Sequence, residues 1–407
     1  MSPTEIALAE KPAHVPADLV VDWNFYQPAA GDAGPHAALK RLHDGPDIVW
    51  TPRNGGHWIV TRAADIEFIQ KNHDPFSMQS ISLPADARPR ILPIEFDPPQ
   101  HAQYRTIINQ FFTPSAVKDL QAEARVLAID LIDGFKKDGR CEFSQAFAQQ
   151  LPIRVFMKMV NQPLDDIDYL LGITEKTVRP RNPEDRVNAH LAMRQYLGGV
   201  IEERRRKPGT DLLSAVVDAK IAGEPISDEN LLGMLTTIMF GGLDTVASTL
   251  GFAAKYLADN PARRHALIDN PGLIHNAADE LLRLFAPSST ARLLTRDFQL
   301  GGVDFKAGDR VYVRTLLHGL DERKFADPLD ADWERPALER NYASFGNGPH
   351  RCPGATLARS ELRIFLEEWL KRIPDFDVAS GEAPVYAYGM VSAIVKLPLV
   401  WDPDTVK

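Results

Sequence analysis

The stretch FGNGPHRCPG, Phe345–Gly354, suits neither the interior of a helix nor the interior of a strand. Glycine and proline fix unusual backbone angles or allow close approach, so we expect a tight loop that holds Cys352 in one position. In the next residues, ATLARSELRIFLEEWL, apolar side chains such as Leu362, Phe365 and Trp369 recur at helical spacing. The thiol therefore lies just before a helix N-terminus, where backbone N–H groups and the helix dipole favour a thiolate.

The composition is that of a soluble globular protein. The chain has 407 residues, of which 44% are hydrophobic and 25% charged. This length allows one large domain or two to three small ones. The net charge of −9 is not offset by a long basic tract, which argues against nucleic acid as the main partner.

The two cysteines, Cys141 and Cys352, exclude a disulfide framework and fit a reducing cytosol. The N-terminus lacks the basic start and apolar run of a signal peptide. The most apolar stretch, Met234–Leu257, contains Asp244, Lys255 and a Gly-Gly pair, so we expect a buried core helix there. These features predict a cytoplasmic protein that does not bind a membrane.

The pattern along the chain predicts one mainly α domain, residues 1–407, with small β-sheets at one side and an irregular segment over residues 1–35. Two β-rich runs flank Asn54-Gly55-Gly56, a strong hairpin signal. Residues 114–222 are mostly helical in pattern. A single long helix should begin after the N-cap Ser227 and end before Asn260-Pro261; at about 1.5 Å per residue it would be on the order of 45–50 Å long. Short β-like runs occupy 291–302, 309–317 and 391–401.

Four roles are open for Cys352. It can be a buried thiol in a glycine-rich turn, the usual role of a lone cysteine. A catalytic nucleophile would need a histidine–acid pairing that the sequence does not assign, and a zinc site would need a second cysteine within a few residues. The remaining chemistry for one exposed, loop-held thiolate is a single axial bond to a haem iron.

The pattern F-x-x-G-x-H-x-C-x-G resembles the haem-binding signature of the cytochrome P450 superfamily, the haem-thiolate monooxygenases. The matching positions are Phe345, Gly348, His350, Cys352 and Gly354. The resemblance implies haem b (iron protoporphyrin IX) as the cofactor and Cys352 as the metal ligand. It also implies a triangular prism with a long central helix over the haem.

A second motif of the family is E-x-x-R, here Glu280-Leu-Leu-Arg283. Ion pairs at i,i+3 are common on helix surfaces, and only the order and distance from the cysteine loop make this pair informative. The resemblance implies that Arg335, in ADWERP, joins the pair in a structural role.

The run GGLDT, Gly241–Thr245, has a bland interpretation as helix-packing glycines beside a partly exposed acid. Two glycines inside a helix cost about 1 kcal/mol each relative to alanine. The resemblance implies that they make room for dioxygen and substrate, and that Asp244 and Thr245 are the catalytic acid–alcohol pair that relays protons.

His101 and Arg105 are spaced i,i+4, so they lie on one helix face, which can simply be solvated. The resemblance implies instead that His101, Arg105, Arg292 and His350 bind the haem propionates, for which arginine is well suited.

The similarity runs nearly end to end and is greatest to the soluble bacterial camphor hydroxylase branch. It implies O2 as co-substrate and electrons from NADH through a flavoprotein reductase and a [2Fe–2S] ferredoxin. Basic residues near the cysteine loop are candidates for ferredoxin docking: Arg105, Arg351, Arg359 and Arg363.

One departure concerns the substrate. Residues 82–99, SLPADARPRILPIEFDPP, contain no tyrosine where the camphor enzyme binds its ketone, and Pro89 or its neighbours occupy the region. We therefore expect a small apolar terpenoid or norisoprenoid, ionone-like or camphor-like. The resemblance places the following residues at the substrate pocket: Pro89, Ile91, Leu92, Thr237, Phe240, Gly241, Ser288, Met390 and Val391.

Two alternatives stay open. A peroxide-driven peroxygenase would share the haem-thiolate site, but such relatives usually lack the acid–alcohol pair. A non-enzymatic haem sensor would normally carry an output domain, and the sequence contains none.

Overall fold

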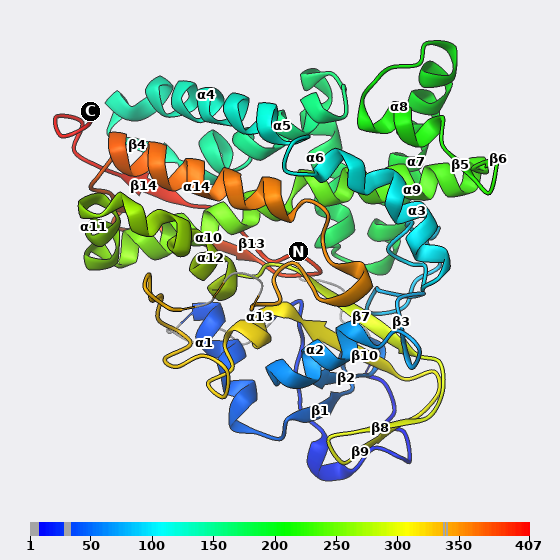
Figure 1. Ribbon diagram of the computed structural model, residues 1–407. Coiled ribbons are helices and arrows are strands. Elements are labelled where there is room, and N and C mark those ends of the chain that lie inside the picture. Colours follow the sequence, from blue (N-terminus) through cyan, green and yellow to red (C-terminus); the bar gives the residue numbers. More distant parts are fainter. Residues whose placement is uncertain (1–7, 28–33, 337, 339–340) are drawn as a thin grey trace.

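The computed structural model describes residues 8–27, 34–336, 338 and 341–407. The helices (Figure 1) are α1 Gly34–Lys40, α2 Ala63–Lys71, α3 Gln100–Asn109, α4 Lys118–Phe135, α5 Gln150–Met159, α6 Ile167–Val178, α7 Pro183–Arg206, α8 Leu212–Val217, α9 Asp228–Leu243, α10 Thr245–Asp259, α11 Pro261–Asp269, α12 Ile274–Leu284, α13 Thr315–Gly319 and α14 Ala355–Arg372. The strands are β1 Ile48–Thr51, β2 His57–Val60, β3 Phe76–Ser77, β4 Arg140–Glu142, β5 Lys220–Ile221, β6 Glu224–Pro225, β7 Ser289–Leu294, β8 Phe298–Leu300, β9 Val303–Phe305, β10 Arg310–Arg314, β11 Asp377–Val378, β12 Val385–Ala387, β13 Ala393–Lys396 and β14 Pro398–Val400.

Part of the segment expected to be irregular, residues 1–7 and 28–33, lies outside the described residues. Residues 8–27 contain a short 3-10 turn at Ala17–Leu19 and one bridge from Val20 to Trp50. Helix α1 begins at Gly34.

The main sheet has the strand order β1-β2-β10-β7-β3 and lies beside the helical layers (Figure 1). Strands β1 and β2 form the predicted hairpin, with Thr51 opposite His57. Its loop places Asn54, Gly55 and Gly56 at φ of 53°, 86° and 75°, left-handed angles that favour asparagine and glycine. Strand β10 pairs with β2 in parallel and with β7 antiparallel, which fixes β7 within the sheet.

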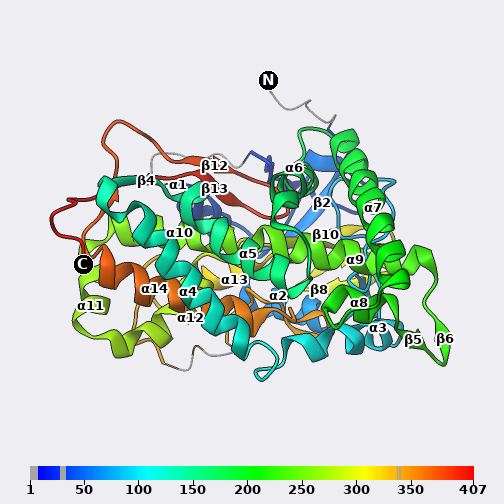
Figure 2. The ribbon, with the colours of Figure 1, turned by 90° about the horizontal axis from the view of Figure 1, so that it is seen from above.

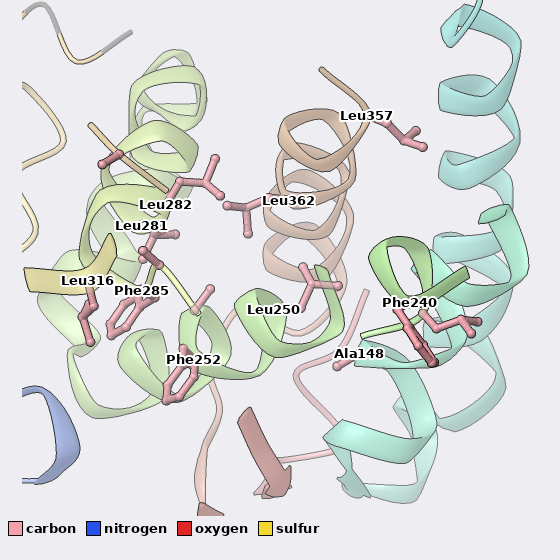
Figure 3. Packing of buried hydrophobic residues seen from close by; sticks show 14 of the residues in the cluster. Ala148, Phe240, Leu250, Phe252, Leu281, Leu282, Phe285, Leu316, Leu357 and Leu362 are labelled. Carbon is pink, nitrogen blue, oxygen red and sulfur yellow. The ribbon is translucent and has the colours of Figure 1, made fainter. Parts of the chain in front are cut away.

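A continuous hydrophobic core extends from Val15 to Trp401. Figure 3 shows Leu282 of α12 and Leu362 of α14 pointing toward one another, with Leu250 of α10 close by. The predicted fold class, mainly α with small sheets, is confirmed.

The expectation of one uninterrupted helix after Ser227 is wrong. Ser227 is the N-cap, its side chain accepting from the backbone N–H of Asn230, but the helix is interrupted at Asp244, where φ is −136° and ψ −33°. Segments α9 and α10 together still cross the molecule (Figure 2). Two glycines weaken the helix just before the break, and a side-chain ion pair of Asp244, described below, holds the distorted residue.

A second difference is strand β4, which lies within the region expected to be helical. It pairs antiparallel with β14, about 260 residues further along the chain, with Cys141 opposite Leu399. A partner so distant in sequence leaves no local signal.

The segment Asp228–Asp259 is long and apolar enough to cross a membrane, but 67% of its most apolar window is buried inside the molecule. Helices α9 and α10 are therefore part of the buried core, as the charged residues and glycines of this segment suggested.

The two glycines of α9 generate a prediction about stability. A Cβ at Gly242 would lie 2.3 Å from the ring of Phe156 in α5, whereas a Cβ at Gly241 would meet nothing within 4 Å. Gly242→Ala should therefore lower the free energy of unfolding by about 1–3 kcal/mol through overpacking. Gly241→Ala should leave it unchanged or raise it by up to about 1 kcal/mol through helix propensity. Urea unfolding followed by circular dichroism measures both; equal effects would refute this packing difference.

Candidate active site

The loop around Cys352 is tight because two of its glycines adopt left-handed angles, φ 68° at Gly346 and 70° at Gly348. At Gly348 a Cβ would also come within 2.7 Å of the Gln70 carbonyl oxygen. The backbone N–H of Cys352 donates to the Phe345 carbonyl at 2.8 Å, closing the loop just before α14. This is the set position that the glycine and proline content predicted.

The Cys352 side chain is accessible to solvent yet closely surrounded by protein. Burial raises the pKa of the thiol, while a hydrogen bond from the Gly354 backbone and the charges of Arg105 and Arg351 act to lower it. The surrounding protein and the neighbouring positive charges therefore act on the pKa of the thiol in opposite directions. Coordination to a metal ion would deprotonate the thiol outright.

Two histidines lie together beside this loop. The rings of His101, on α3, and His350 are 4.1 Å apart. Nε2 of His101 and both ring nitrogens of His350 are buried with no hydrogen-bond partner in the described part of the chain. Burial lowers the pKa of His101 to about 4, and burial together with His101, Arg292 and Arg105 lowers that of His350, so both rings are neutral.

Two arginines complete the cluster. Arg292, on β7, is 5% exposed, and burial lowers its pKa to about 10. Among the described residues it donates only to Thr290 Oγ1 and the Ala291 carbonyl. Arg105, also on α3, donates to the Arg351 carbonyl and to Asn109. No described carboxylate forms an ion pair with either guanidinium.

Buried histidine nitrogens without a partner are costly, and neither guanidinium has a carboxylate among the described residues; together these features indicate that an anionic ligand completes the site. One thiol for an iron, together with arginine and histidine donors for two carboxylates, fits haem b. The structure therefore brings together all of the residues expected to bind the propionates.

The expected structural triad is also assembled. Glu280 and Arg283 are fully buried and joined at 2.7 and 2.8 Å, and Nε of Arg335 lies 3.0 Å from Glu280 Oε1. Arg283 also donates to the carbonyls of Gly319, Pro328 and Asp330.

A neighbouring network was missed in the sequence. Asp279 accepts from Tyr342 at 2.6 Å and from Arg359 at 2.7 Å, and the Arg359 guanidinium lies 5.0 Å from the centre of the Phe345 ring. Arg359, a candidate for ferredoxin docking, is therefore committed inside the protein. Asp279, the acid immediately before the E-x-x-R motif, is the sequence feature that could have indicated this network.

Asp244 does not lie free beside Thr245. Its carboxylate accepts from Arg179, which follows α6, at 2.7 and 2.9 Å. Burial opposes the charge of Arg179, but Asp244 and Glu175 outweigh it and raise its pKa. Arg179 also donates to the Val391 carbonyl, so one side chain joins α6, the break between α9 and α10, and the loop before β13. Arg179 lies far from Asp244 in sequence, which gave no signal of this contact.

Thr245 Oγ1 donates to the Gly241 carbonyl at 3.1 Å. Gly241 is exposed and faces open space, although it lies in the middle of a largely buried helix. The alcohol and the bare glycine are thus neighbours along one accessible face, while Gly242 serves helix packing.

The residues expected at the substrate pocket come from four segments. Ile91 and Met390 lie in one small apolar cluster, separate from the main core, with Met78, Ile81 and Ile94. Leu92 docks on α9, where its N–H donates to the Gly233 carbonyl at 3.0 Å, one turn before Thr237. Phe240 is 8% exposed. Ser288 forms a bridge with Val391, and the Pro89 carbonyl accepts from Arg88.

Comparison with known proteins gives the family. The family model for "Cytochrome P450" matches residues 151–384. Among curated proteins, "Probable cytochrome P450 127A1" of Sinorhizobium fredii is 33% identical over 96% of both chains. "Nocardicin C N-oxygenase" of Nocardia uniformis subsp. tsuyamanensis is 31% identical over 93% of this chain and 98% of its own.

Solved structures agree with this result. The crystal structure of CYP101J2 is similar with a TM-score of 0.88 and 34% identity, covering 97% of this chain and 100% of that one. The structure of CYP101C1 gives 0.86 and 33% over the same shares. With its cysteine loop, its unpartnered donors and these relatives, the chain belongs to the cytochrome P450 family.

Proposed function

We propose that this cytochrome P450 monooxygenase inserts one oxygen atom from O2 into a small apolar terpenoid or norisoprenoid, ionone-like or camphor-like, in the cytoplasm. The single domain would receive electrons from NADH through a flavoprotein reductase and a [2Fe–2S] ferredoxin. The observation that carries the proposal is the accessible, loop-held Cys352 beside buried donors without acceptors.

Haem b, when bound, would supply the iron chemistry that activates O2, and the Cys352 thiolate would bind that iron. Arg105, Arg292, His101 and His350 would hold its propionates. The protein's own contribution is to orient this group and to keep water away from it.

Proton supply is assigned to Asp244 and Thr245. Thr245 Oγ1 lies on the accessible face of α9–α10 and is the alcohol that can order a ligand there. The Asp244 carboxylate is held by Arg179, so it must leave this ion pair, or share it with water, each time it passes a proton inward. The Arg179–Asp244 contact then also limits when protons enter.

The apolar residues expected at the pocket support this choice of substrate. Leu92, Phe240 and the Ile91–Met390 cluster offer apolar surface, and residues 82–99 lack a phenol donor. Recognition should depend on shape and apolar contact rather than on one hydrogen bond to the substrate.

A groove between α4 and α14 supports ferredoxin docking on that side. Lys118 and Arg363 line it, together with Arg125, whose charge is paired with Glu367 and Glu368. Arg351 and Arg105 lie at the cysteine loop.

Removal of the thiol is the first test of the proposal. Cys352→Ala should abolish the strongly red-shifted Soret band of the reduced carbon monoxide complex, and product formation with it, because Cys352 is the iron ligand. Cys141→Ala is the control and should leave the spectrum intact, because Cys141 lies in β4 away from the cluster. A retained red-shifted band in Cys352→Ala would disprove the ligand assignment.

Thr245→Ala should bind haem and substrate and still consume NADH, but yield less hydroxylated product per NADH and more hydrogen peroxide, because the alcohol is lost.

Asp244→Asn should slow turnover on the order of a hundredfold, the usual contribution of a positioned acid. Glu175→Gln is the matched control, since it removes an exposed partner of Arg179 and leaves Asp244 in place. Product, peroxide and NADH are counted together for each variant. If Thr245→Ala still formed one hydroxylated product per NADH consumed, the GGLDT run would have a packing role only.

Camphor should bind at least about tenfold more weakly than β-ionone. Neither ketone finds a phenol donor in residues 82–99, so binding depends on the apolar surface that is buried, and β-ionone is the larger of the two ligands. Spin-state titration of the holoenzyme with both ligands measures this difference. Tight, fully high-spin camphor binding would show that another group replaces the missing tyrosine.

A further inference from the structure

The segment between β3 and α3 contains a buried ion pair that the haem site does not use. The two terminal guanidinium nitrogens of Arg88, Nη2 and Nη1, donate to the Glu95 carboxylate at 2.7 and 2.9 Å. The two side chains are only 4% and 3% exposed. A buried pair of this kind is not needed for stability, because apolar residues of similar volume often serve as well.

Glu95 does more than pair with Arg88. Its Oε2 accepts the backbone N–H of Ile91 at 2.8 Å, and its Oε1 lies 3.4 Å from the backbone N–H of Ile81. Arg90 donates to the Glu95 carbonyl. One carboxylate thus fixes the backbone of two residues that are ten apart in sequence.

These two residues carry the apolar wall of the proposed pocket. The side chains of Ile81 and Ile91 form a small cluster with Met78, against which Ile94 and Met390 pack. The Ile81 carbonyl accepts from the Ala291 N–H, next to Arg292. Any shift of Ile81 or Ile91 therefore moves the wall relative to the haem-binding strand β7.

Arg88 of this ion pair also binds other polar groups of the segment between β3 and α3. Ser82 Oγ and the Pro89 carbonyl both accept from Arg88. Asp86 lies 3.5 Å from Arg88 and pairs with Arg186 of α7 at 2.9 Å. The cationic groups of the segment are thus bound within the protein, and the pocket side remains apolar.

Resting on the proposed function, we propose that Glu95, held by Arg88, is a positioning residue for substrate specificity: it sets the place of Ile81 and Ile91, and so the shape of the apolar wall that selects the substrate and the carbon oxidised.

The test separates positioning from stability. Arg88→Met/Glu95→Met removes both charges together, so no unpaired charge stays buried. The carbon monoxide spectrum should stay that of the wild type, and the unfolding temperature should fall only through the lost acceptor of the Ile91 and Ile81 N–H groups. Its peptides covering residues 78–96 should exchange amide hydrogen faster, because Ile91 N–H has lost its acceptor. β-Ionone should bind about tenfold more weakly by spin-state titration, and the ratio of its hydroxylated products should change.

Glu95→Gln provides a second variant that keeps the side-chain shape and one acceptor oxygen, and it should show a smaller change in the same direction. Arg204→Met is the matched control: it removes a buried arginine that lies on α7, binds the Asn161 carbonyl and is near Asp211, away from the wall. It should leave Kd and product ratio unchanged even where it lowers stability.

Wild-type Kd values and product ratios in both Glu95 variants would overturn the inference, whatever the exchange shows. Failure of the proposed function is read separately, from a wild-type protein that lacks the red-shifted carbon monoxide band or forms no oxygenated product.

Discussion

The fully buried carboxylate of Glu280 constrains much of the haem-side structure, because a charge at 0% exposure must be paired. Arg283 and Arg335 neutralise it, and Arg283 binds three carbonyls of the 319–330 segment. Gly319 is required there, since a Cβ would come within 2.1 Å of the Arg283 carbonyl oxygen. Loss of one partner of such a pair costs about 3–5 kcal/mol. The preceding residue of α12, Asp279, binds Tyr342 and Arg359, so this one helix holds both flanks of the cysteine loop.

The site combines opposite electrostatic arrangements. Among the described residues, the Glu280 carboxylate is matched by Arg283 and Arg335, whereas Arg105 and Arg292 near Cys352 have no carboxylate partner. Burial keeps His101 and His350 neutral, and it lowers the pKa of Arg292 without preventing its charge. In the proposed site, the donors around Cys352 would bind an anionic cofactor because they have no carboxylate partner. The paired charges around Glu280 hold the backbone next to this site in place.

Arginines also link the substrate side to the rest of the molecule. Arg179 joins α6 to Asp244 at the helix break, and Arg186 joins α7 to Asp86. Both arginines extend from the α6–α7 layer, so movement of that layer would act together on Asp244, the proposed proton donor, and on the proposed apolar wall. Asp86 lies beside Arg88, which binds Glu95, and Glu95 in turn accepts the backbone N–H of Ile91.

The sequence by itself determined features that short segments control: the glycine-rich turn at Cys352, the hairpin at Asn54, the N-cap Ser227 and the helix start after the cysteine loop. Each depends on local backbone angles and spacing, and the family resemblance added the positions of the donors. Only the tertiary structure decided the break at Asp244, the pairing of β4 with β14 and the roles of Arg179 and Glu95. The physical reason is that buried charges and strand edges find their partners across the fold, and sequence spacing carries no information about which distant group will satisfy them.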